Sequence, residues 1–80
     1  MNQQQAQDEW DAALAKFRED QEGCEWSDDT VSDLGACFLD EHHNKWRHWA
    51  KALGMTENDV RAAAADIISE VGIKVEDPFP

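Results

Sequence analysis

The stretch KWRHWAKALGMTENDVRAAAADIISEV at residues 45–71 decides the fold, because it encodes two helices joined by a tight turn. Gly54 suits the left-handed backbone position that ends a helix, and Thr56 with Asp59 three residues later has the pattern of a capping box. Beyond the turn, one face repeats at the 3.6-residue helical period and predicts a helix over 57–71: Val60, Ala63, Ala64, Ile67, Ile68 and Val71.

Two further helices are predicted upstream of this pair. The first covers about residues 4–22, where one apolar stripe contains Ala6, Trp10, Ala13, Leu14 and Phe17. After a connection at 24–26, a second stripe runs through residues 28–53: Val31, Leu34, Gly35, Phe38, His42, Trp46, Trp49 and Leu53. We expect one long helix here. The alternative is a break at Asn44, because asparagine favours caps and turns over helix interiors.

The chain is therefore predicted to be an all-α single domain over residues 1–80, a three-helix bundle or a four-helix bundle if the break occurs. Residues 72–80 form a short extended tail. The alternation in 73–76 suits a strand, but one such segment cannot make a sheet, so we expect the tail to pack on the bundle with Pro78 and Pro80 at its end. The predicted core contains Trp10, Phe17, Leu34, Phe38, Trp49, Leu53, Val60 and Ile67.

Acidic residues dominate the composition and are unevenly placed. Eighteen acids and seven bases give a net charge of −11, and residues 1–44 alone hold twelve of the acids and two of the bases. This charge disfavours nonspecific attraction to nucleic acid and to anionic membranes, so a basic protein is the expected partner. Without a long apolar run or a signal-peptide pattern, the sequence predicts a cytoplasmic protein.

The histidines and cysteines have the chemistry of metal ligands but not the spacing. His42, His43 and His48 are separated by one and five positions, and Cys24 and Cys37 by thirteen, whereas histidines that bind zinc on a helix usually lie four apart. We therefore expect no metal and no cofactor. Instead, His42 is expected to extend the apolar stripe and His43 and His48 to be solvated, while the cysteines are expected to be buried free thiols of a reducing compartment.

No pattern in the chain predicts catalysis. Asp40 and Glu41 lie beside histidines, but acid and base chemistry also needs a cleft and opposed pKa shifts, which a short bundle does not readily build. The sequence has no serine elbow, no CxxC pair and no glycine-rich phosphate loop. The prediction is a protein that is not an enzyme and has no catalytic residue.

Residues 45–54 are the only stretch with several bases and no acid. A basic helix with aromatic residues can hold phosphates or stack on bases. The favoured alternative places Trp46 and Trp49 in the core and pairs the cations with acids of the first helix. The secondary basic surface consists of Lys45, Arg47, His48 and Lys51.

The run from Lys45 to Ala63 resembles the helix, Leu-Gly turn and capped helix of many bacterial helix-turn-helix domains. The resemblance implies a second helix whose early exposed residues would reach base edges in the major groove. In this chain those residues are Glu57, Asn58, Asp59 and Arg61, and two of the four would meet phosphates with the wrong charge. The geometry of the helix pair is carried over, while DNA binding by a dimer of this chain remains a rival hypothesis.

Acids three or four residues apart on the first helix, such as Asp8 with Asp11 and Glu19 with Glu22, recur every ~5 to 6 Å along the axis, a scale comparable to spacing along a nucleic-acid strand. In size and charge the chain resembles small acidic phage inhibitors, including DNA mimics and anti-CRISPR proteins. The leading hypothesis is a non-enzymatic inhibitor or adaptor that docks on a basic, nucleic-acid-binding partner. Its acidic surface would contain Asp8, Asp11, Glu19, Glu22, Asp28, Asp29, Asp33 and Asp40. A dimerisation module, or a salt-adapted protein whose charge only maintains solubility, is the third alternative.

Overall fold

The structure is a computed structural model that describes residues 2–76. Over these residues the elements are α1 (Gln3–Gln21), β1 (Glu25–Trp26), α2 (Val31–Glu41), α3 (Lys45–Leu53), α4 (Glu57–Val71) and β2 (Ile73–Lys74). The all-α prediction is confirmed, and the helices expected over about 4–22 and 57–71 correspond to α1 and α4. None of the helices in this part of the chain is long and apolar enough to cross a membrane.

The prediction of one continuous helix over 28–53 is wrong. The structure has the alternative, two helices, α2 and α3, with a break over residues 42–44. The backbone leaves the helical conformation at His42, and the His42 carbonyl accepts hydrogen bonds from the N–H groups of Lys45 at 2.8 Å and Trp46 at 3.1 Å. In one straight helix, residues 38 and 49 would lie about 16 Å apart along the axis. The turn instead brings α3 over α1, where the ring of Trp49 packs against Trp10 at 6.0 Å between centroids.

The expectation that the tail packs without forming a sheet is wrong. β1 and β2 pair in parallel, with Glu25 opposite Ile73 and Trp26 opposite Lys74. The Ile73 N–H donates to the Cys24 carbonyl, and the Val75 N–H donates to the Trp26 carbonyl, both at 2.8 Å. The segment expected to be a plain connection therefore supplies the missing second strand. Pro78 and Pro80 lie outside the described residues.

Gly72 allows the two strands to come together beneath the end of α4. A Cβ atom there would lie 2.7 Å from both the Ile68 carbonyl oxygen and Cδ1 of Trp26, and 2.8 Å from the Cys24 carbonyl oxygen. The connection between α1 and β1 turns at Gly23, whose φ is 77°. This close backbone approach buries Trp26 to 9% exposure, so the small sheet is packed against the helices.

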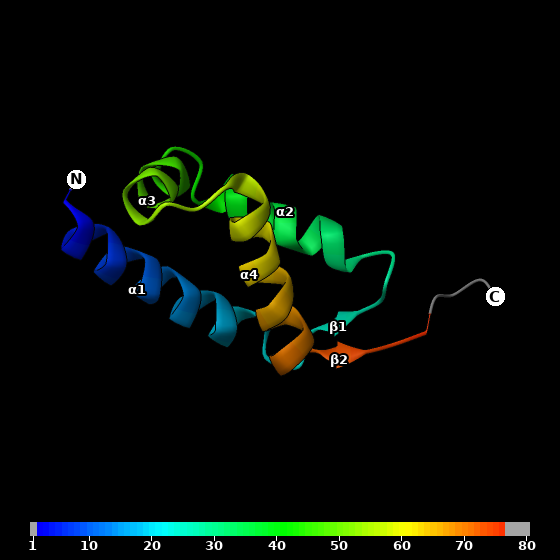
Figure 1. Cartoon of the computed structure of the whole chain (residues 1–80). Helices are drawn as coiled ribbons and strands as arrows, with labels where there is room; N and C mark the ends of the chain where they lie inside the picture. The colour runs from blue at the N-terminus through cyan, green and yellow to red at the C-terminus, as the bar shows by residue number, and fades with distance from the viewer. Residues whose placement is uncertain (1, 77–80) are drawn as a thin grey trace.

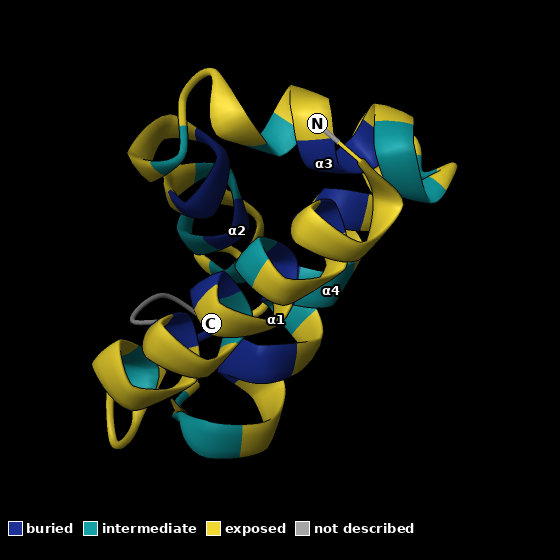
Figure 2. Ribbon diagram, turned by 90° about the vertical axis from the view of Figure 1, so that its left-hand side faces the viewer, coloured by how far each residue is buried: buried dark blue, intermediate teal, exposed yellow. Residues whose placement is uncertain are grey.

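The core lies where α4 packs against both α1 and α2 and where α3 packs against α1 (Figure 1). Phe38 of α2 makes edge-on ring contacts with Trp10 at 5.7 Å and Phe17 at 5.1 Å on α1. Figure 2 shows the buried residues on the sides of the helices that face one another. The buried apolar residues are Ala6, Trp10, Ala13, Phe17, Trp26, Phe38, Leu39, Trp49, Ala50, Val60, Ala64, Ile67 and Ile68. Of the predicted core, only Leu34 and Leu53 are half-buried at its edge.

The turn between α3 and α4 has the predicted geometry. Gly54 adopts φ 70° at the end of α3, and the Met55 N–H donates to the Ala50 carbonyl at 2.8 Å. Thr56 Oγ1 accepts a hydrogen bond from the Asp59 N–H at 3.2 Å, and Asp59 Oδ2 accepts one from the Thr56 N–H at 2.9 Å. Both halves of the capping box are present, so the start of α4 is fixed by local chemistry.

Candidate functional site

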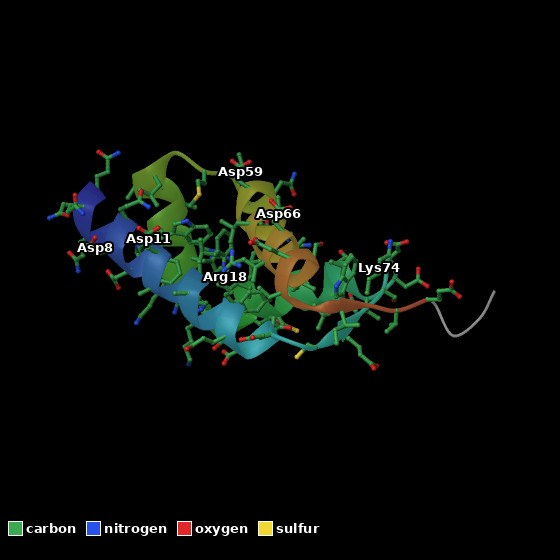
Figure 3. All side chains as sticks on the ribbon, turned by 90° about the horizontal axis from the view of Figure 1, so that it is seen from below. Asp8, Asp11, Arg18, Asp59, Asp66 and Lys74 are labelled. Carbon is green, nitrogen blue, oxygen red and sulfur yellow. The ribbon has the colours of Figure 1, made fainter. Side chains whose placement is uncertain are left out.

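The outward face of α1 carries half of the predicted acidic surface. Asp8, Asp11 and Glu19 are exposed and lie on the side opposite the buried stripe of this helix, and Glu22 follows as its exposed C-cap. Figure 3 shows Asp8 and Asp11 on α1 near the N-terminal end of the molecule. These four carboxylates form no ion pair within 4.0 Å with any base of residues 2–76. Their charge is available to a partner.

Glutamines of the first turns hold two of these carboxylates in place. Gln4 Nε2 donates to Asp8 Oδ1 at 3.0 Å, and Gln7 Nε2 donates to Asp11 Oδ1 at 2.9 Å, each one helical turn away. The amides are neutral, so they orient the carboxylates without cancelling their charge.

The other half of the predicted surface lies elsewhere. Asp33 and Asp40 are exposed on α2, on the side away from Phe38. Because the inner side of α1 and the inner side of α2 meet at the aromatic contacts of Phe38, the outward faces of the two helices point away from each other. The eight predicted acids therefore form two faces, not one.

The two faces meet at one end of the molecule, which we call the sheet end and define as residues 22–30 with residues 72–76. Its exposed acids are Glu22, Glu25, Asp28, Asp29 and Glu76. Lys74 is its only base, and Nζ of Lys74 lies 3.4 Å from Asp28 Oδ1 and 5.6 Å above the ring of Trp26. A cleft of about 450 Å³ lies beside β2 and is lined by Asp28, Lys74, Val75 and Glu76.

Acids of α4 that the sequence prediction omitted extend the α1 face. Asp59, Asp66 and Glu70 are exposed, and Figure 3 shows Asp59 and Asp66 along α4 beyond α1. Arg18 of α1 donates to Glu70 Oε2 at 2.9 Å, which raises the pKa of Arg18 and lowers the pKa of Glu70 through the hydrogen bond and the charge attraction. These acids lie on the side of the 57–71 helix opposite its apolar stripe, and this position on the helical wheel could have identified them from the sequence.

The basic residues of α3 are not neutralised by α1, contrary to expectation. Lys45, Arg47, His48 and Lys51 are exposed, and within residues 2–76 none of them forms an ion pair within 4.0 Å. The expected burial of Trp49 is confirmed, and Trp46 is half-buried with Arg47 over its ring at 5.4 Å. Since the apolar side of α3 faces α1, its cations point outward, as do the carboxylates of α1.

His42 occupies the turn between α2 and α3 and extends the aromatic cluster, as the apolar stripe predicts. Its ring lies 4.7 Å from that of Phe38 and 5.2 Å from that of Trp49. Burial lowers the pKa of His42, Glu41 opposes this effect, and Lys16 and Lys45 add to it. The neutral imidazole is therefore the form that the fold favours.

Cys24 and Cys37 are unpaired, but both are exposed, which corrects the expectation of buried thiols. Cys24 lies in the connection after α1, and Cys37 lies on α2 away from the core stripe, so neither position is covered by another helix. Among residues 2–76, no cluster of three or more histidine, cysteine or acidic side chains is arranged to hold a metal ion.

The chain matches no protein-family model, and the searches of curated proteins and of solved structures gave no match. The site is accordingly defined by its own surfaces. These are an acidic surface that runs from the outward face of α1 through the sheet end to α2, and a basic surface on α3.

Proposed function

We propose that this protein is a non-enzymatic inhibitor or adaptor whose acidic surface docks on a basic, nucleic-acid-binding protein. The acidic surface includes the eight predicted residues, with the sheet end at its centre because both acidic faces reach it. In this role the carboxylates of the protein occupy positions that phosphates occupy when the partner binds nucleic acid. Long-range attraction would speed the encounter and make it sensitive to salt.

The observation that carries the proposal is the exposed, unpaired state of these carboxylates. Of the eight residues, only Asp28 forms an ion pair among residues 2–76, although bases are present on neighbouring elements. A chain whose charge served only its own stability would gain from pairing its acids with Lys45, Arg47 and Lys51. The bases of α3 instead form no ion pair with these carboxylates, which suits recognition of another molecule by each surface.

The rival, a helix-turn-helix regulator, draws support from the exposed bases of α3. The start of α4, which would contact the DNA bases in such a regulator, argues against this rival. Arg61 Nη2 lies 3.2 Å from Glu57 Oε1, so the charge of Arg61 is neutralised within its own helix. Asp59 is also occupied, since its carboxylate accepts the capping hydrogen bond of Thr56. The first turn of α4 therefore presents acidic groups where a DNA reader needs cationic or neutral donors.

Affinity capture from the native host with matched charge variants tests the proposal. One variant neutralises the sheet end with Glu22→Gln, Asp28→Asn and Asp29→Asn, and its control neutralises α3 with Lys45→Gln and Lys51→Gln. We expect the wild type and the α3 control to retain basic nucleic-acid-binding proteins and the sheet-end variant to lose them. Equal capture by all three proteins would contradict the proposal. Tight binding of the isolated protein to duplex DNA at moderate salt, measured by gel shift, would favour the helix-turn-helix rival instead.

A further inference from the structure

β1 and β2 form a two-stranded sheet, so among residues 2–76 the outer edge of each strand has no strand partner, and the edge of β2 lies at Lys74. Ile73 and Val75 direct their N–H groups to β1. Since successive residues of a strand direct their peptide groups to opposite sides, the N–H and C=O of Lys74 point away from β1. Figure 1 shows β2 at the rim of the molecule, with β1 on one side and no described helix on the other. Free backbone groups of this kind, here the N–H and C=O of Lys74, can pair with another strand.

The side chains around this edge fit a basic strand. Glu76 follows β2 directly, Glu25, Asp28 and Asp29 are exposed on β1 and the loop after it, and the single base of the sheet end, Lys74, is already paired with Asp28. The cleft of about 450 Å³ is lined by Asp28, Lys74, Val75 and Glu76, so two carboxylates lie beside the backbone of Lys74 and the segment that follows it. A second copy of this chain is disfavoured at the edge, because acid would face acid.

Ile73 supplies the apolar contact that an added strand needs. It is 56% exposed and is the only large apolar side chain in the described part of the chain that is so exposed. It lies on the face of the sheet that Glu25 shares, since the two residues are directly paired. An incoming strand that alternates cationic and β-branched residues would place its apolar side chains beside Ile73 and its cations near the carboxylates.

We propose that the free edge of β2 receives an extended, lysine- or arginine-rich segment of the partner as the third strand of the sheet. This inference rests on the proposed function and specifies the part of the acidic surface that makes the directional contact. Main-chain hydrogen bonds at Lys74 supply affinity in this mode of recognition, and the acidic rim selects a basic segment.

The test uses a short capped peptide of alternating lysine and valine, with amide exchange and peptide affinity as readouts. We expect the peptide to protect the Lys74 amide from hydrogen exchange. Lys74→Pro removes only the outward N–H and keeps the hydrogen bonds of Ile73 and Val75, so it should weaken binding by about tenfold or more relative to Lys74→Ala. Lys74→Ala should bind at least as tightly as the wild type, because it removes one like charge.

A peptide with proline at the positions that would pair with Lys74 gives a second comparison that does not depend on how the protein variant folds. Equal affinity of Lys74→Pro and Lys74→Ala for the first peptide, together with equal affinity of the two peptides for the wild type, would overturn strand addition. So would binding that leaves the Lys74 amide unprotected, or dimers in sedimentation that Lys74→Pro abolishes. The proposed function fails separately, when neutralising Glu22, Asp28 and Asp29 leaves capture of basic proteins unchanged.

Discussion

The basic surface of α3 and the acidic sheet end lie at opposite ends of the molecule (Figure 1) and are held in different ways. α3 is anchored by side chains, because Trp49 is 2% exposed and packs with Trp10 and His42. The sheet end is anchored by backbone, because two strands of two residues meet at Gly72. The comparison shows that the two ends present unlike charges because each element packs its apolar side on the core and leaves its charged side chains in solvent.

Removing the anchor of α3 should have the largest effect on stability. Trp49→Ala deletes a buried aromatic side chain, and we expect a loss of about 3–5 kcal/mol in the free energy of unfolding, measured by urea denaturation. Trp46→Ala, at a half-buried neighbour on the same helix, is the control and should cost clearly less. Equal losses at the two positions would show that α3 is not anchored through Trp49.

The backbone anchor of the sheet end can be broken by a single methyl group. Gly72→Ala places a Cβ atom 2.7 Å from the Ile68 carbonyl oxygen and from Trp26, so we expect a loss of about 1–3 kcal/mol. Gly35→Ala is the matched control in α2, where the nearest atom would be the Arg61 carbonyl oxygen at 3.5 Å. The control should gain about 0.5–1 kcal/mol from helix propensity. Chemical denaturation measures both changes, and a neutral Gly72→Ala would contradict the close packing of the strands.

Mild acid should weaken the packing of α3 through His42, which contacts Trp49. The folded state lowers the pKa of His42 below its ordinary value of 6.5, so the neutral imidazole is stabilised by folding. This contribution is complete above about pH 6.5 and is lost as the pH falls from there through the folded pKa. We expect the unfolding free energy of the wild type to fall across this window more than that of His42→Phe. Parallel pH profiles of the two proteins would exclude this role of His42.

The sequence was sufficient for the features that depend on local chemistry. The period of Val60, Ala64 and Ile67 predicted α4, and Gly54 with the Thr56 capping box predicted the turn before it. These signals act within one or two helical turns, where spacing and side-chain hydrogen bonds decide the conformation.

Features set by distant parts of the chain were not predictable from local patterns. The stripe of 28–53 fits one helix as well as two, because only the packing of Trp49 on Trp10 favours the break. The alternation in 73–76 indicated one strand, but its partner at Glu25–Trp26 is too short to show a period and lies far away in the sequence. Helical spacing likewise placed the acids outward on each helix but gave no relative orientation of α1 and α2, so a single acidic face was expected and two were found.

The central claim is that the acidic surface takes the place of nucleic acid on a basic partner, and competition tests it most directly. A partner captured from the host is loaded with labelled DNA or RNA, and the protein is added while the bound label is followed by fluorescence anisotropy. We predict that the wild type and the Lys45→Gln, Lys51→Gln control displace the label, with an efficiency that falls as salt is raised, and that the Glu22→Gln, Asp28→Asn, Asp29→Asn variant does not. A stable ternary complex of partner, nucleic acid and wild-type protein would contradict the account.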